Sequence, residues 1–258
     1  MNLIEPNWHA PANVHAFMTT RTDGVSIGAY GDVSGQSGLN PASHVSDDVT
    51  HVQQNRSILR ALLPNDPLWL NQTHSIKVWL QTDNEYDHSA PPPEADAVVL
   101  TQKGAVGVIM TADCLPVLFA SDDGQIIAAA HAGWRGLVDG VLERTVQVMV
   151  EQGADVASMH VWLGAAIGPN RFEVGQDVRD AFIPKPPLAA GDVQACFKRT
   201  DADKYLADIY GLARARLHAL GITRITGGEL CTVSDAERFY SYRRDHVTGR
   251  MASLIWFD

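Results

Sequence analysis

The feature that most constrains the fold is a pair of apolar segments on either side of a short polar turn. Cys114–Phe119 and Ile126–His131 are rich in aliphatic side chains, and Ser121–Gly124 between them consists of Ser, Asp and Gly. Residues of these types favour tight turns, and two apolar runs joined by such a turn predict an antiparallel β-hairpin.

The predicted hairpin brings Cys114 and His131 together. Paired residues in an antiparallel hairpin have a constant sum of residue numbers, so a turn centred on Ser121–Gly124 pairs position 114 with position 131. Directly opposed residues place their Cβ atoms roughly 4.5–5.5 Å apart on one face of the sheet. The thiol and the imidazole are therefore expected within reach of each other or of one metal ion. Pro116 removes one backbone donor from this ladder.

The remaining apolar patterns predict helices and strands that alternate along the chain. Helical spacing of apolar residues predicts helices over about 47–63, 136–152 and 203–220, and apolar runs predict strands at 77–81, 96–100, 106–110, 159–163 and 223–226. A chain of 258 residues that is 45% hydrophobic can bury a large core. The expected fold class is α/β (α+β), a single domain over residues 1–258 with a mixed β-sheet, hairpins and flanking helices.

Composition excludes several classes of partner. The net charge is −10 and no run of Lys or Arg occurs, which argues against binding to nucleic acid or to anionic membranes. No apolar stretch is long enough for a membrane helix, and the first residues lack a signal-peptide pattern, so we expect a cytoplasmic protein. Cys114, Cys196 and Cys231 are few and widely spaced, which predicts reduced thiols. Nothing in the sequence indicates an oligomeric state.

His74 completes a candidate metal or catalytic site. Asn71–Ser75 is polar and follows an apolar run, as at the end of a strand that opens into a pocket. His74, Cys114 and His131 together give three protein ligands with an open fourth position, the pattern of catalytic zinc. Alternatively, Cys114 is a thiolate nucleophile and His131 is its base. The two interpretations exclude each other, because a metal-bound sulfur attacks poorly. The other histidines show no ligand spacing.

Other segments suggest contacts to an anionic or aromatic substrate. His131–Gly136 joins a strand to a helix, where backbone amides could bind an anion and Arg135 could hold a phosphate or carboxylate. Phe239–Arg250 concentrates aromatic rings and arginines, which suit a nucleobase and an anion. The predicted substrate-binding residues are Asn71, Arg135, Arg243 and Arg250.

The motifs occur in an order that resembles a known family. They are Thr19–Ser26, Asn71–Ser75, Ala112–Val117, His131–Gly136, Gly164–Pro169, Phe172–Gly175, Tyr240–Asp245 and Thr248–Arg250. Together they closely resemble the YfiH family, which has been described as a laccase-domain or polyphenol oxidoreductase family and as purine nucleoside phosphorylases. The resemblance covers almost the whole chain.

The resemblance implies zinc bound by His74, Cys114 and His131, which would be the catalytic residues. It implies phosphorolysis of adenosine, inosine, guanosine and methylthioadenosine, with deamination of adenosine as a second activity. Zinc-activated water would attack C6 of adenine, and phosphate would lie at the Gly133–Gly136 turn. The substrates would be a small-molecule nucleoside and phosphate. Asn170 and Arg171 stand where some family members have two cysteines.

Other functions stay open from the sequence. Copper is an alternative metal for the three-ligand site, but a full laccase centre usually draws on His-x-His pairs and this chain has none. The chain could instead be a Cys–His hydrolase or a laccase-like oxidase acting on another small molecule, or a protein without enzymatic activity. The general acid or base is unassigned, because Asp113 is expected to point to the face opposite Cys114.

Overall fold

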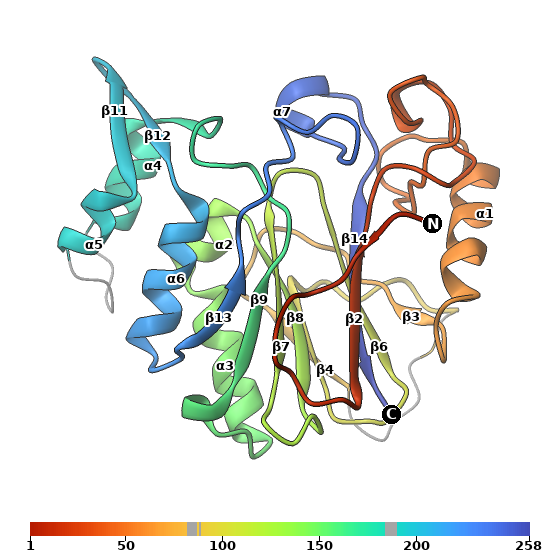
Figure 1. Ribbon diagram of the computed structural model, residues 1–258, viewed down its shortest axis with the longest axis horizontal. Helices are drawn as coiled ribbons and strands as arrows, with labels where there is room; N and C mark the ends of the chain where they lie inside the picture. Colours follow the sequence, from red (N-terminus) through yellow and green to blue (C-terminus); the bar gives the residue numbers. More distant parts are fainter. Residues whose placement is uncertain (82–86, 88, 184–189) are drawn as a thin grey trace.

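The computed structural model describes residues 1–81, 87, 89–183 and 190–258. Two mixed β-sheets lie face to face, and helices cover both outer surfaces (Figure 1). This mixed α/β architecture confirms the predicted fold class. No helix in the described part of the chain is long and apolar enough to cross a membrane.

The larger sheet contains the predicted hairpin. Its order is β13 (Arg224–Gly227), β9 (His160–Leu163), β7 (Leu115–Ala120), β8 (Ile127–Ala132), β5 (Ala97–Leu100) and β4 (Val78–Gln81). The two outer pairs, β13 with β9 and β5 with β4, are parallel, and the inner pairs are antiparallel. Each strand expected in this sheet from the sequence is present.

The second sheet joins the two ends of the chain. Its order is β1 (Leu3–Ile4), β2 (Val14–Thr19), β14 (Met251–Phe257), β6 (Val106–Thr111) and β3 (Pro67–Leu68). β14 is the central strand and pairs antiparallel with both β2 and β6. A smaller three-stranded sheet, β10 (Glu173–Gly175), β12 (Lys204–Ala207) and β11 (Phe197–Asp201), lies at one end of the molecule (Figure 1).

Alternating side chains of the larger sheet divide the core into two layers. Val99, Val117 and Phe119 pack toward the helices, whereas Val98 and Leu118 pack toward the second sheet. This division follows from the two-residue period of a strand. The helices on the first face are α2 (Trp134–Asp139), α3 (Val141–Glu151) and α6 (Ile209–Ala219), and α1 (Val49–Arg60) covers the outer face of the second sheet. Further helices are α4 (Gln176–Phe182), α5 (Ala190–Ala195) and α7 (Tyr242–Asp245).

Two of the predicted helices need correction. The helix expected over 136–152 is two helices, α2 and α3, because Gly140 adopts a left-handed φ of 101° between them. The helix expected over 203–220 begins only at Ile209, since residues 204–207 pair with β11 as β12. Asp208 ends that strand and caps α6, where its side chain accepts a hydrogen bond from Gly211 N.

Candidate active site

The hairpin β7–β8 forms, but its register differs from the prediction. Pro116 pairs with His131 and Ala120 pairs with Ile127, so the sum of paired numbers is two larger than expected. The turn is shifted by one residue along the chain, because Ser121 and Ile126 still belong to the ladder, with Ser121 N bonded to Ile126 O at 2.9 Å. A shift of two residues keeps every side chain on its face, and Cys114 therefore becomes the diagonal neighbour of His131.

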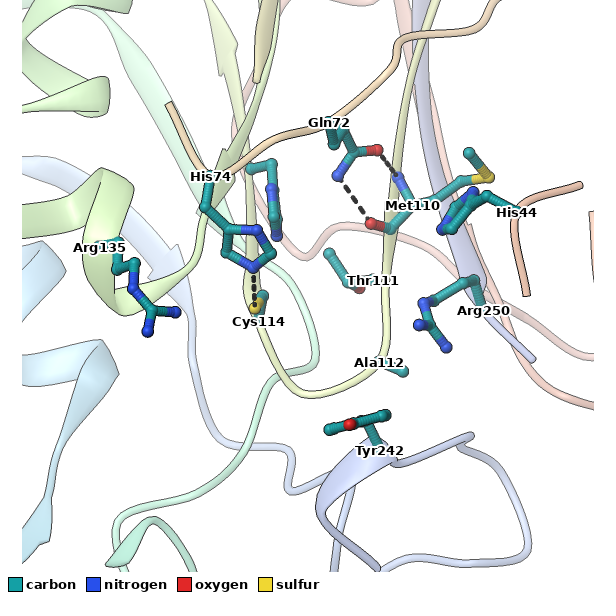
Figure 2. Close-up of a pocket in the computed structure, with 11 residues that line it drawn as sticks. His44, Gln72, His74, Met110, Thr111, Ala112, Cys114, Arg135, Tyr242 and Arg250 are labelled. Carbon is teal, nitrogen blue, oxygen red and sulfur yellow. Dashed lines mark hydrogen bonds between the residues drawn. The ribbon is translucent and has the colours of Figure 1, made fainter. Parts of the chain in front are cut away.

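His74, Cys114 and His131 nevertheless converge. Their ligand atoms all lie within 4.8 Å of one another. His74 Nε2 is 3.7 Å from Cys114 Sγ, and the two imidazole rings are 4.7 Å apart with an interplanar angle of 69°. Figure 2 shows the His74 ring directed at the Cys114 sulfur. One thiolate and two imidazoles this close together are a donor set that suits a zinc or copper ion.

Gly133 allows this close packing. A Cβ atom at this position would lie 2.7 Å from His74 Cδ2 and 3.1 Å from Cys114 Sγ. Any larger residue would therefore displace two of the three candidate ligands. The Gly133–Gly136 turn, which the sequence suggested as an anion site, is packed against the ligand cluster and begins the short helix α2.

The Asp96 carboxylate is hydrogen-bonded to both His131 and His74. Its Oδ1 lies 2.8 Å from His131 Nδ1 and accepts a hydrogen bond from His74 N at 3.0 Å. Its Oδ2 accepts hydrogen bonds from Thr73 N, Ser75 N and Ser75 Oγ. This carboxylate is fully buried, so it orients the His131 ring with Nε2 toward Cys114 and fixes the loop that carries His74. Sequence analysis missed Asp96, whose only signal is an acidic residue directly before an apolar strand.

The electrostatics of the cluster favour charged side chains in the metal-free chain. Burial would raise the pKa of Asp96, but hydrogen bonds from His131 and Ser75 outweigh it and hold that pKa well below the usual range. Burial also opposes ionisation of Cys114, yet the neighbouring His131 and His74 lower the pKa of the thiol to about 6. The pKa of His131 is raised to about 9, because Cys114 and Asp96 together outweigh its burial. A metal cation can replace the proton of the imidazolium and bind both the thiolate and the neutral imidazole.

The backbone on either side of the cluster is strained. His74 and Asp113 adopt positive φ angles of 60° and 90°, a region that non-glycine residues rarely occupy. Asp113 points away from the cluster, as expected. Its carboxylate accepts hydrogen bonds from Thr232 Oγ1 at 2.6 Å and Arg243 N at 2.7 Å. These contacts stabilise the turn that leads from β6 in one sheet to Cys114 and β7 in the other.

The cluster forms part of the wall of a cavity of about 410 Å³. Figure 2 shows the residues around it, which come from β6, β8, α2, α7 and the connecting segments. The lining consists of His44, Gln72, His74, Met110, Thr111, Ala112, Cys114, His131, Arg135, Tyr242 and Arg250. None of these described lining residues carries a carboxylate, although the whole chain has a net charge of −10. The lining therefore carries the charges of Arg135 and Arg250 and no carboxylate.

Two of the four predicted substrate-binding residues line this cavity. Arg135 and Arg250 do so, whereas Asn71 and Arg243 are absent from the described lining. Asn71 forms an isolated β-bridge with Glu94. Arg243 donates a hydrogen bond through Nη1 to a carbonyl oxygen at 2.8 Å and lies over the Phe172 ring. For these two residues, substrate contact stays a prediction.

Six lining residues were not predicted as site residues: His44, Gln72, Met110, Thr111, Ala112 and Tyr242. Gln72 uses its side-chain amide to bond both the N–H and the carbonyl of Met110, which ties the His74 segment to β6. Thr111 carried one sequence signal, a polar residue at the end of an apolar strand. Tyr242 lay in a segment already noted for its aromatic rings. His44 had no signal, because its loop reaches the cavity only through the tertiary fold.

Comparisons with known proteins agree with the resemblance. A family model described as multi-copper polyphenol oxidoreductase laccase matches residues 15–258. The purine nucleoside phosphorylase of Haemophilus influenzae is 45% identical over 260 residues and covers 100% of both chains. The purine nucleoside phosphorylase YfiH of Escherichia coli is 46% identical over 256 residues, or 98% of each chain.

Solved structures show the same fold. A crystal structure of a Neisseria meningitidis protein has a TM-score of 0.88 at 42% identity and covers 100% of both chains. The YfiH protein of Bacillus licheniformis has a TM-score of 0.85 at 27% identity, with 95% of this chain and 93% of that chain covered. On the motifs, the fold and these matches, the chain belongs to the laccase-like YfiH family.

Proposed function

We propose that the protein is a zinc-dependent purine nucleoside phosphorylase that also deaminates adenosine. The observation that carries this proposal is the position of the His74, Cys114 and His131 cluster in the wall of a cavity of about 410 Å³ that Arg135 and Arg250 also line. Cavities of roughly 300–1,000 Å³ accommodate small organic ligands. The two arginines of the lining suit an anionic co-substrate such as phosphate. The names of the H. influenzae and E. coli relatives supply the reaction class.

The residues present fit a zinc ion. The donor set is one thiolate and two imidazoles, with Asp96 hydrogen-bonded to the second nitrogen of His131. A zinc ion held there supplies Lewis-acid activation of an oxygen ligand. Asp96 keeps Nε2 of His131 free for the metal, and Gln72 and Asp96 hold His74 in place. Arg135 and Arg250 supply positive charge for phosphate, and Tyr242 supplies a ring on which a purine can stack.

In the phosphorolysis, a phosphate oxygen bonds to C1′ of the ribose while the bond from C1′ to the base nitrogen breaks. The electron pair of that bond goes to the purine, which takes a proton. The products are the free base and ribose 1-phosphate, or 5-methylthioribose 1-phosphate from methylthioadenosine. The proposed substrates are adenosine, inosine, guanosine and methylthioadenosine. Residues 1–258 would act as one catalytic domain, because the cavity is lined by residues from His44 to Arg250.

A different function has its own supporting observation. The lowered pKa of Cys114, to about 6, suits a thiolate nucleophile with His131 as its partner in a hydrolase. One Cys and two His ligands also suit copper, which would support oxidation of a phenol. The third donor, His74, favours a metal over a free nucleophile. Metal analysis of the purified protein distinguishes zinc, copper and an empty thiol site.

The test follows the products of adenosine and inosine by chromatography, with the metal-analysed protein and with Cys114→Ala. Free base formed only in the presence of phosphate supports phosphorolysis, and inosine formed from adenosine without phosphate supports deamination. If neither product exceeds the Cys114→Ala background, the proposed function is wrong.

A further inference from the structure

We infer that Arg250, His44 and Thr111 form the phosphate-binding site, across the cavity from the His74, Cys114 and His131 cluster. The inference rests on the proposed function and adds the position of the co-substrate. Figure 2 shows Arg250 and His44 on the opposite side of the cavity from His74 and Cys114. A substrate between the two groups would have its reacting centre within reach of both.

The Arg250 guanidinium is held in one orientation. Its Nη1 donates hydrogen bonds to the carbonyl oxygens of Thr248 at 3.0 Å and Gly249 at 2.9 Å, and its backbone N donates to Asn40 Oδ1 at 3.0 Å. Within the described chain, Nε and Nη2 make no hydrogen bond and the guanidinium has no carboxylate partner. These donors are therefore available to an anion, and a fixed guanidinium binds phosphate oxygens in pairs.

The charge of Arg250 is incompletely compensated. Burial lowers its pKa, and the opposing effects of Cys114 and Asp113 are smaller. Withdrawing a cation from water without an ion partner is unfavourable, so its position in the cavity favours binding of an anion. An exposed arginine on the surface would give no such argument.

His44 adds a neutral donor beside Arg250. Partial withdrawal from water, together with the charges of Arg250 and Arg56, lowers the pKa of His44. The ring is therefore neutral at pH 7 and offers one N–H to an acceptor. An oxygen of phosphate is an acceptor of the right kind.

Thr111 supplies the independent observation. Its side chain is only 2% exposed, and its Oγ1 has no hydrogen-bond partner among the described residues. Buried hydroxyl groups nearly always have a partner. Thr111 lines the cavity, so a ligand there can provide that partner. Valine would fill the same space in β6 without leaving a hydroxyl unpaired, and the presence of threonine indicates a polar contact.

The first experiment measures inorganic phosphate. Binding of phosphate to the zinc-loaded protein is followed by calorimetry in the absence of nucleoside, and KM for phosphate and for inosine are measured separately. Arg250→Gln is expected to weaken phosphate binding and to raise KM for phosphate at least tenfold, while KM for inosine changes less than threefold. Thr111→Val is expected to raise KM for phosphate about threefold.

Matched variants control for the substitutions themselves. Ser253→Ala removes another buried, unpaired hydroxyl, on β14 outside the described cavity lining. Arg199→Gln removes an exposed arginine from β11, where its Nη2 bonds Ala202 O. Both are expected to keep the wild-type KM for phosphate. Zinc content and thermal unfolding of each variant confirm that the metal site and the fold are intact.

The outcomes separate this inference from the proposed function. If the wild type performs phosphorolysis and Arg250→Gln retains its affinity for phosphate, the inferred phosphate-binding site is wrong and the proposed function stands. If no phosphorolysis occurs but phosphate binding depends on Arg250, the proposed function is wrong and the inferred phosphate-binding site stands. If the wild type binds inosine 5′-monophosphate but not inorganic phosphate, the site takes a substrate phosphate and the inference is overturned.

Discussion

At the scale of single residues, the candidate site depends on a buried carboxylate that touches neither the cavity nor a substrate. Asp96 is hydrogen-bonded to the ring Nδ1 of His131 and accepts a hydrogen bond from the backbone N–H of His74. A single side chain thus fixes two of the three candidate ligands, and its removal should affect both together. Metal binding by the cluster would therefore be coupled to the conformation of the His74 loop through this residue.

Asp96→Asn is expected to weaken zinc binding by about 10- to 100-fold, the usual effect of losing a carboxylate that orients a histidine ligand. Asparagine replaces one of the two carboxylate oxygens with an amide nitrogen that cannot accept, so either the contact with His131 at Oδ1 or the bond from Ser75 at Oδ2 is lost. Competition with a chromophoric chelator measures the affinity. Asp123→Asn, in the β7–β8 loop, serves as the control and should bind zinc like the wild type. Equal affinity in both variants would contradict the positioning role of Asp96.

The metal-free protein should show an unusually reactive thiol. The pKa of Cys114 is lowered to about 6, whereas the pKa of a free cysteine is about 8.5. Since thiolate is the reactive form, alkylation by iodoacetamide should rise with pH and reach half its maximal rate near pH 6. Cys114→Ser gives the background from Cys196 and Cys231. Bound zinc should protect Cys114, and a midpoint above pH 8 would exclude the proposed ion pair.

At the scale of secondary-structure elements, α7 lies at the cavity and presents Tyr242. The helix is anchored at Arg243, whose backbone N donates to Asp113 beside Cys114, and at Ser241, whose side chain caps it. Tyr242 itself is 56% exposed and lines the cavity. An aromatic ring with one open face at a binding cavity is suited to stacking on a base.

Tyr242→Ala should therefore raise KM for inosine, whereas Tyr242→Phe should leave it nearly unchanged. Stacking of a base on an aromatic ring contributes about 1–3 kcal/mol, which corresponds to roughly 5- to 150-fold in affinity. KM for phosphate should change little in either variant. Steady-state kinetics with both substrates varied provide the measurement, and an equal loss in the Phe variant would point to the hydroxyl instead.

Elements were more predictable than their contacts. The apolar runs predicted all the strands of the hairpin region, because buried strands need little beyond side-chain pattern. The hairpin register was wrong by two residues, since Ser121 uses its backbone in the ladder and its hydroxyl to bond Ile126 N. Periodicity also continued through Gly140, where only the backbone conformation ends the helix. His44 and Asp96 act through tertiary contacts, for which a linear pattern carries little signal.

At the scale of the whole molecule, the helical layer is fastened by a buried ion pair. Arg216 on α6 is 2% exposed, pairs with Glu143 on α3 and donates to the carbonyl of Val138 on α2 at 2.8 Å. Three helices that cover the larger sheet thus meet at one guanidinium. Removing its carboxylate partner leaves a buried cation without compensation.

Glu143→Gln is expected to lower the free energy of unfolding by about 3–5 kcal/mol, as for other broken buried pairs. Urea denaturation measures the change. Glu151→Gln breaks the exposed pair between Arg144 and Glu151 and should cost only about 0–1 kcal/mol. Similar losses in the two variants would contradict the stabilising role of the pair between Arg216 and Glu143.

The cavity takes its two functional walls from different sheets. Cys114 and His131 belong to the hairpin of the larger sheet, and Thr111 and Arg250 adjoin the paired strands β6 and β14 of the second. Between the sheets lies an apolar core that includes Leu118 and Ile255. The volume of that core sets the separation of the two walls. Aliphatic substitutions in this core, which do not contact the cavity, would therefore change the separation of its walls. Such substitutions would alter the proposed activity through the volume of the core.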